Sequence, residues 1–371
     1  MRAFFECLLS ECKTSHELHL TVEHYFTSHF ATLDMGIYGI GVRHCLRLKD
    51  FKLGLKLFQE LVGRIEKGDE EVVANSEHNQ EFVMPKVEIA FNMLLDHYAK
   101  RKYIHETRTI FEGVEGVLAR TKVYPLKVVV FNSMLDAYVR TGNLKSAFMF
   151  LDTKILSNPQ VNYDNFTITT LTRGVKQPSE AHYLEKIFTM VEEAPFPLEI
   201  VVFNVLIEAC INSHQIQRGF RLFRSMDYQH YSRPLYASDY AEDSLGLFKS
   251  TKPQYNIKPD VVTFNTIIKA CCQIHNIDSA LNYLLVLKVS EHLKPNDVTF
   301  NTIIDGCTRS RNRMELAWRI LEDMYRSGVA PDSFTFSTLV KGIKKNSQRD
   351  SKQSMERALH FLETVTKECM A

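Results

Sequence analysis

Near-copies of one phrase recur through the second half of the chain. The phrase reads PDVVTFNTIIKACC, then KPNDVTFNTIIDGC, then PDSFTFSTLVKG, starting at Pro259, Lys294 and Pro331. Successive copies place a phenylalanine every 36 residues, at Phe264, Phe300 and Phe336. A period of this size indicates an array of supersecondary units, because one such unit cannot bury its apolar faces alone and must stack on its neighbours.

Weaker copies of the phrase precede these three. We number each unit from the residue equivalent to Val261, which is position 1. On this ruler the units start at Met35, Glu88, Val128, Asn165, Ile200, Val261, Asp297 and Ser333. Seven of these units are recognisable, and the one that starts at Met35 is degenerate.

Each unit has the pattern of two amphipathic helices. Apolar residues of the first helix recur at i, i+3, i+4 and i+7, as in Phe264, Ile267, Ile268 and Cys271. A polar turn and a second apolar pattern follow, with a small residue near its start at Ala147, Gly219, Ala280 and Ala317. Lys-Pro or Ala-Pro then ends the unit. The sequence therefore predicts an all-α superhelical solenoid of stacked antiparallel helix pairs.

Two stretches interrupt the period. Residues 62–84 are charged and residues 227–256 are rich in Tyr and Ser, and both follow a second helix, so we expect surface loops. This predicts an N-terminal helical cap or decayed repeat at 1–34 and a degenerate repeat with a loop insertion at 35–87. Repeats follow at 88–226, a second loop insertion at 227–256, and further repeats at 257–371.

Composition excludes several classes of protein. The 371 residues carry a net charge of +1, and no apolar run is long enough to span a membrane. Glu6 and Glu11 argue against a secretory signal and against an organelle transit peptide.

The eight cysteines form no Cys-x-x-Cys pair, so we expect reduced thiols and no metal site. Four of them are predicted core residues at position 11, namely Cys45, Cys210, Cys271 and Cys307.

The repeated units resemble the pentatricopeptide repeat (PPR) family. The resemblance rests on units of 35 to 36 residues with PDVVTFNTII, and on a second helix with a small residue before LF or LL. It covers roughly residues 35–371 and is strongest at 261–332. It implies a P-type-like, right-handed superhelix of about seven to eight units that binds single-stranded RNA, one base per repeat.

Asparagine recurs at position 5, one turn into the first helix. It occupies five units as Asn92, Asn132, Asn204, Asn265 and Asn301, while Thr169 and Ser337 take the position in two others. An amide both donates and accepts hydrogen bonds, which suits a base edge. Helix N-capping is the alternative. However, Thr263 and Thr299 are better placed to cap, and asparagine is a poor residue inside a helix.

The resemblance also implies a rule for each base, in which position 5 acts with the last residue of its unit. Asn with Asp reads U, Asn with Asn reads C, and Thr or Ser with Asp or Asn reads a purine. Four pairs follow the rule and imply U, U, C and U: Asn132 with Asp164, Asn204 with Asp260, Asn265 with Asn296, and Asn301 with Asp332.

Two pairs depart from the rule. Thr169 with Glu199 favours a purine, and Asn92 with Lys127 leaves a loose pyrimidine. The second residue for Ser337 is unassigned. The implied ligand is a single strand, 5′-YURUCUR-3′. The insertion before Asp260 leaves the middle U and the register open.

Two further positions are candidates for RNA contact. Position 2 is apolar in all seven units, as Ile89, Val129, Phe166, Val201, Val262, Val298 and Phe334. In the family the side chain at this position wedges against bases. Packing between repeats would explain an apolar residue there equally well. Position 13 is cationic in five units, as Arg47, Lys100, Arg140, Arg309 and Lys345. A row of such side chains could contact the phosphates of an RNA strand. Alternatively, each could be a solvated cation at a helix end, where it suits the helix dipole.

These features favour an RNA-binding adaptor without catalysis, cofactor or small-molecule substrate, which could act with protein partners that supply catalysis. The family works mostly in mitochondria or plastids, which gives the expected compartment. A helical scaffold for protein–protein interaction is the alternative, but its Trp-x-x-Leu-Gly-x-x-Tyr pattern is absent and Trp318 lies in a second helix. An enzyme is disfavoured because the deaminase motifs, the Walker loop and Gly-x-Ser-x-Gly are missing.

Overall fold

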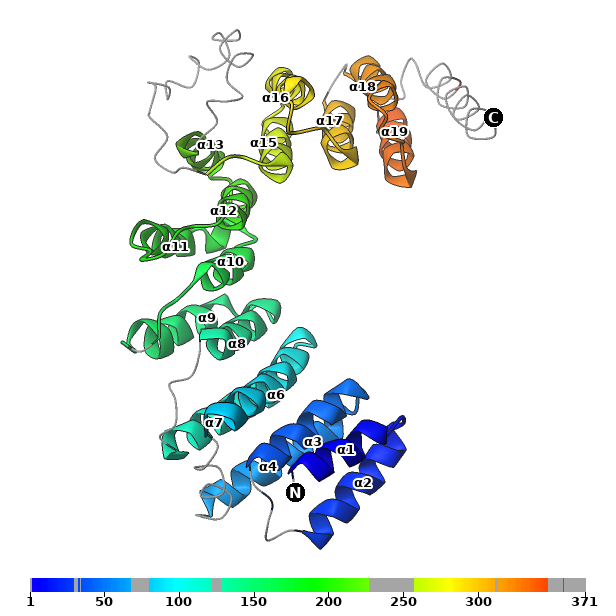
Figure 1. Ribbon diagram of the computed structural model, residues 1–371. Helices are drawn as coiled ribbons and strands as arrows, with labels where there is room; N and C mark the ends of the chain where they lie inside the picture. Colours follow the sequence, from blue (N-terminus) through cyan, green and yellow to red (C-terminus); the bar gives the residue numbers. More distant parts are fainter. Residues whose placement is uncertain are drawn as a thin grey trace. The chain divides into compact units, whose positions relative to one another are not determined.

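The computed structural model describes residues 2–29, 33, 35–67, 80–121, 128–159, 161–226, 257–310, 313–345 and 356. Every regular element in these ranges is a helix (Figure 1). The chain divides into two compact units. The first comprises Met1–Val175 and Thr189–Phe196, and the second comprises Lys176–Phe188 and Pro197–Ala371.

The first unit is a stack of antiparallel helix pairs. The first helices of successive pairs, α3, α6, α8 and α10, contact one another in order, and each of the first three also contacts the helix that follows it. The elements are α1 (Arg2–Glu11), α2 (Ser15–Ser28), α3 (Met35–Arg47), α4 (Phe51–Glu66), α6 (Gln80–Lys100), α7 (Ile104–Thr121), α8 (Val128–Arg140), α9 (Leu144–Phe150), the π-helical turn η2 (Leu151–Leu156) and α10 (Asn165–Gly174).

The second unit repeats this arrangement. Helices α12, α15, α17 and α19 contact one another in order, and the first three pack against their second helices. The elements are η3 (Pro178–Glu180), α12 (Ile200–Asn212), α13 (Ile216–Ser225), α15 (Val261–Gln273), α16 (Ile277–Val289), α17 (Asp297–Arg309), α18 (Met314–Arg326) and α19 (Ser333–Lys345). Helix α11 (His182–Glu192) has residues in both units.

The predicted repeat starts agree with the helix starts, with one exception. Helices α3, α8, α10, α12, α15, α17 and α19 each begin at the predicted position 1. Helix α6 instead begins at Gln80, and α4 continues to Glu66, so the loop predicted for 62–84 is wrong at both ends. The apolar stripe of α4 extends that far because Leu61 and Ile65 are buried. The predicted loop at 227–256 lies outside the described residues.

The helix caps differ from the expected ones. Asp164, Asp260 and Asn296 are the N-caps of α10, α15 and α17, and each side chain accepts the backbone N–H of the third helical residue. That residue is a threonine whose hydroxyl accepts the backbone N–H of the cap, which completes a capping box. The expectation that Thr263 and Thr299 cap is therefore wrong, because they lie one turn further in.

The four position-11 cysteines lie in the core, as predicted, with exposures of 1% or less. Burial raises the pKa of Cys45 and of Cys210 to about 12, and that of Cys307 to about 11. A thiol reacts through its thiolate, so burial and a raised pKa both suppress reaction. No group of three His, Cys, Asp or Glu in the described residues could hold a metal ion, and no helix there is long and apolar enough to cross a bilayer.

We expect the native protein to show selective thiol labelling. A short pulse of N-ethylmaleimide at pH 7 should modify the exposed Cys7 and spare the buried position-11 cysteines, and mass spectrometry of peptides would locate the adducts. The same pulse in urea is the control and should label all of them. Equal labelling of Cys7 and Cys271 in the native protein would contradict the packing of α15.

Candidate nucleic-acid interface

In four repeats the fold brings position 5 against the N-terminus of the next first helix. The last residue of each of these repeats lies at the N-cap of the following first helix, so the side chains of the two predicted base-reading residues meet there. Nδ2 of asparagine donates to Oδ1 of the cap in four copies: Asn132 to Asp164 (3.0 Å), Asn204 to Asp260 (3.1 Å), Asn265 to Asn296 (3.1 Å) and Asn301 to Asp332 (3.4 Å). The first copy lies in the first unit and the other three lie in the second.

The insertion at 227–256 does not disturb this geometry. Asn204 and Asp260 are 56 residues apart in sequence, whereas Asn265 and Asn296 are 31 apart, yet both pairs join the same atoms at 3.1 Å. Helix α12 also packs directly on α15. In the second unit, position 5 of one repeat therefore pairs with the cap of the next repeat in the same way across the insertion as after it.

A buried threonine completes each contact. The third residue of the next first helix donates its hydroxyl to Oδ1 of the asparagine, at 2.7 Å from Thr167, 2.6 Å from Thr263, 2.6 Å from Thr299 and 2.7 Å from Thr335. All four threonines are fully buried. We call each set of asparagine, cap and threonine a capping triad.

The capping triad leaves a small and defined set of free groups. The asparagine is 8% exposed or less, its Oδ1 is taken by the threonine, and one N–H of Nδ2 is taken by the cap. Among the described residues, the second N–H of Nδ2 has no partner. The second side-chain atom of the cap keeps hydrogen-bonding capacity, although at Asp332 the backbone N–H of Phe334 also acts on the carboxylate. With an aspartate cap this leaves one N–H donor and a carboxylate acceptor, whereas with Asn296 it leaves only N–H donors, one on Asn265 and two on Asn296.

The carboxylate of Asp332, at the start of α19, is charged at neutral pH. Hydrogen bonds from Thr335, its backbone N–H first, lower the pKa of Asp332 below its ordinary value. An ionised carboxylate only accepts hydrogen bonds. The carboxylate of Asp332 is therefore an acceptor over the whole neutral range.

The remaining position-5 residues lack this triad. Asn92 accepts a hydrogen bond from Ser133 Oγ at 3.0 Å, and its predicted partner Lys127 lies outside the described residues. Thr169 is buried and donates to the carbonyl of Phe166 at 3.0 Å. Glu199 is the N-cap residue of α12 but makes no side-chain capping bond. Ser337 is exposed on α19.

Position 2 is exposed in all seven recognisable repeats. Its seven apolar side chains, from Ile89 to Phe334, have exposures between 42% and 57%. Packing between repeats, the alternative for these residues, does not fit such exposure. Position 2 lies three residues before position 5 on the same helix, so an apolar side chain accompanies each asparagine on one helix face.

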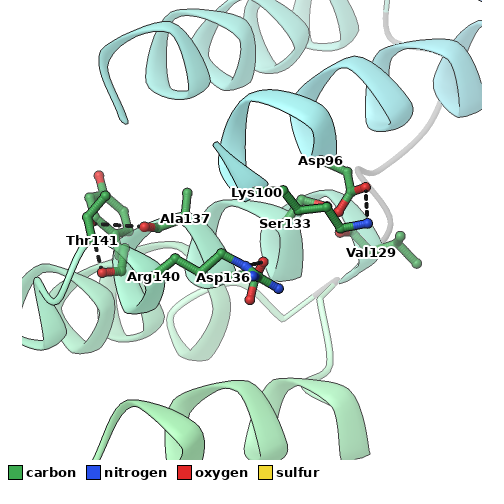
Figure 2. A network of polar contacts seen from close by, with 9 residues as sticks. Asp96, Lys100, Val129, Ser133, Asp136, Ala137, Arg140 and Thr141 are labelled. Atoms are coloured by element: carbon green, nitrogen blue, oxygen red, sulfur yellow. Dashed lines mark hydrogen bonds and ion pairs between the residues drawn. The ribbon is translucent and has the colours of Figure 1, made fainter. Parts of the chain in front are cut away.

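Four of the five cations of position 13 have protein partners. Lys100 pairs with Asp96 at 2.6 Å and Arg140 pairs with Asp136, each one turn back on its own helix (Figure 2). Arg309 pairs with Asp305 in the same way at 2.9 Å. Exposed pairs of this kind are worth only about 0.3–0.5 kcal/mol, so they open at little cost.

Arg47 has a different environment from the other cations of position 13. Its guanidinium donates to the carbonyls of Leu9 (2.9 Å) and Cys12 (3.1 Å) at the end of α1, where a cation suits the helix terminus. These bonds give Arg47 a role in holding α1. The side chain of Lys345 lies outside the described residues.

The threonines of the capping triads were missed at the level of sequence. Their signal was present, since the third residue after the cap is threonine in DNFT, DVVT, NDVT and DSFT. Valine takes the same place in the repeats that depart from the rule, at Val130 and Val202. The threonine was mistaken for a cap because sequence alone does not show where the first turn begins.

Comparison with known proteins identifies the class. A family model described as the PPR repeat family matches residues 259–309 and 295–345, and one described as a pentatricopeptide repeat-containing protein matches residues 105–226. The chain is 24% identical over 208 residues to the pentatricopeptide repeat-containing protein At5g10690 of Arabidopsis thaliana, covering 49% of this chain and 34% of that protein. The chain belongs to the pentatricopeptide repeat family.

Solved structures show the same fold. Crystal structures of PPR10 in complex with an 18-nt psaJ RNA element, one of them a cysteine-to-serine variant, match with a TM-score of 0.61 at 16% identity. The match covers 96% of this chain and 44% of PPR10. The predicted all-α solenoid of helix pairs is thus confirmed. The chain spans about a third of the curated relative and less than half of PPR10.

Proposed function

We propose that this protein binds single-stranded RNA with sequence selectivity and acts as an adaptor without catalysis of its own. The observation that carries the proposal is the capping triad, which recurs four times with the same bonds and leaves hydrogen-bonding groups free beside an exposed apolar residue. The RNA bound to PPR10, a protein of the same fold, supports this choice of ligand.

The free groups of each capping triad match particular bases. An aspartate cap leaves a donor and an acceptor, and uracil offers the complementary N3–H donor beside carbonyl acceptors. Asn296 in place of aspartate leaves donors on both amides, which suit the N3 and O2 acceptors of cytosine. The triads of Asn132, Asn204, Asn265 and Asn301 thus favour U, U, C and U, which supports 5′-YURUCUR-3′ as the ligand.

The exposed residues of position 2 would stack against the same bases. Base stacking on a protein surface contributes about 1–3 kcal/mol per base with aromatic residues, and Phe166 and Phe334 are the aromatic members here. Opening of the pairs at Lys100, Arg140 and Arg309 would free these cations for phosphates. Ordinary duplex RNA hides its base edges, so it is excluded as a ligand.

Membership of the family supports a role in the processing, stability or translation of transcripts in mitochondria or plastids. Catalysis in such a pathway would come from protein partners. Crosslinking of the protein to RNA in cells, followed by sequencing, would identify the transcript and its compartment together.

We expect a synthetic strand with the sequence 5′-UUAUCUA-3′ to bind at least tenfold more tightly than a scrambled strand of the same composition at moderate salt. The reason is that each well-formed base contact discriminates by about 1–3 kcal/mol. Fluorescence anisotropy would measure both dissociation constants, with the same site in a duplex as the control. Equal affinity for the site and the scrambled strand would contradict sequence-selective binding. Tight binding to neither strand would favour a protein-binding scaffold.

A further inference from the structure

Each capping triad contains a buried threonine that the base rule does not include, and its hydrogen bonds give this threonine a role. The threonine donates to Oδ1 of the asparagine at 2.6–2.7 Å, and the same hydroxyl lies 2.8–2.9 Å from Oδ1 of the cap. A hydroxyl has one hydrogen, and the asparagine contact is the shorter in every triad. The cap oxygen already accepts the backbone N–H of the threonine at 2.8–3.1 Å. The hydroxyl hydrogen therefore belongs to the asparagine.

This bond fixes which way the asparagine amide faces. In the triad of Asn265, the backbone N–H of Thr299 holds Oδ1 of Asn296, and that oxygen accepts Nδ2 of Asn265. A reversed Asn265 amide would place its Oδ1 against Oδ1 of Asn296, and two acceptors repel. It would also turn Nδ2 toward Thr299 and remove the acceptor of the hydroxyl. The hydroxyl thus favours the orientation in which Oδ1 faces Thr299 and Nδ2 faces Asn296.

We propose that Thr167, Thr263, Thr299 and Thr335 are specificity-determining positioning residues, each of which orients the asparagine of the preceding repeat and thereby sets the base that this repeat prefers. The proposal rests on the proposed function. It places the control of each base one repeat further along the chain, at a side chain that is fully buried and touches no base.

The two repeats whose residue pairs depart from the base rule agree with this role of the threonine. Val130 and Val202 follow the two pairs that break the base rule, and valine has the shape of threonine without the hydroxyl. Asn92 has Ser133, one turn further into α8, as its donor instead. The repeat of Asn92 should therefore be the least selective of the repeats with asparagine.

The test is Thr299→Val, with Thr299→Ser as its matched control. Valine keeps the buried volume and removes the hydroxyl, whereas serine keeps the hydroxyl and removes a methyl group. Dissociation constants are measured for 5′-UUAUCUA-3′ and for strands with U, A or G at the fifth position. Wild type and Thr299→Ser should prefer C about tenfold, and Thr299→Val should prefer it less than about threefold. The preference for U at the sixth position should stay unchanged in all three proteins.

A merely structural threonine gives a different result. In that case Thr299→Val lowers the melting temperature but keeps the wild-type preference for C, and this outcome overturns the proposal. Loss of the preference in Thr299→Ser overturns it as well, because the hydroxyl is present. If circular dichroism shows that Thr299→Val is unfolded, Thr335→Val carries the same test at the sixth position. A wild-type protein without any preference at these positions contradicts the proposed function itself.

Discussion

Asn301→Thr should change the base preferred at one position from U to a purine. In the wild-type protein the Asn301 amide donates to Asp332 and accepts from Thr335, which leaves one N–H of the amide and the remaining lone pairs of the carboxylate for the base. Threonine is shorter, cannot bridge these two partners, and presents a hydroxyl in place of the amide. The repeat then has the Thr and Asp pair that the family rule assigns to purines.

The expected shift is about tenfold in relative affinity, because a well-formed pair of base contacts discriminates by about 1–3 kcal/mol. Four strands that differ only at the sixth base would be compared in parallel by fluorescence anisotropy. Thr302→Ala is a suitable control, since Thr302 follows Asn301 directly and its hydroxyl donates to the carbonyl of Val298 in the same helix. Unchanged preference for U in Asn301→Thr would mean that Asn301 reads no base.

Of the substitutions considered, Phe264→Ala should lower the free energy of unfolding the most. Phe264 is fully buried in the second unit, and its ring meets Phe223 edge to face at a centroid distance of 5.6 Å and lies 6.3 Å from Tyr283. Removal of a buried phenylalanine side chain costs about 3–5 kcal/mol, because the cavity closes only partly. In a repeat array this loss is local. Hydrogen exchange read by mass spectrometry should therefore rise most in α13, α15 and α16, and urea denaturation would give the overall change.

Val262→Ala is the matched control, two residues earlier on the same helix. Val262 is exposed, so its removal should change the free energy of unfolding by less than about 0.5 kcal/mol. It should instead weaken RNA binding about fivefold, a loss of roughly 1 kcal/mol. A large loss of stability in Val262→Ala, or a small one in Phe264→Ala, would reverse the assignment of the two faces of α15.

Much of the fold follows from local sequence patterns. Apolar residues at helical spacing, closed by Lys-Pro or Ala-Pro, correctly predicted the starts of α3, α8, α10, α12, α15, α17 and α19. These signals are local because a helix is a local structure, with its hydrogen bonds four residues apart. The pattern failed at α6, which begins at Gln80, eight residues before the recognisable phrase.

The candidate site was predicted in part. Regular spacing pointed to the position-5 asparagines and to their partners, since both recur with the repeat. The same regularity did not distinguish Thr263 as a cap from Thr263 as a third helical residue, because the two readings differ by one turn. It also gave the position-13 cations one common role, whereas Arg47 contacts the end of α1 and Lys100 pairs with Asp96.

The sequence by itself thus determined the period, the helix pairs and the residues that vary between copies. Only the tertiary structure decided that Val262 faces solvent while Thr263 is buried beside it, and that Asn204 meets Asp260 across the insertion. The physical reason is the range of the contacts. The hydrogen bonds of the asparagine in a capping triad join side chains 31 to 59 residues apart, on helices that become neighbours only when the repeats stack.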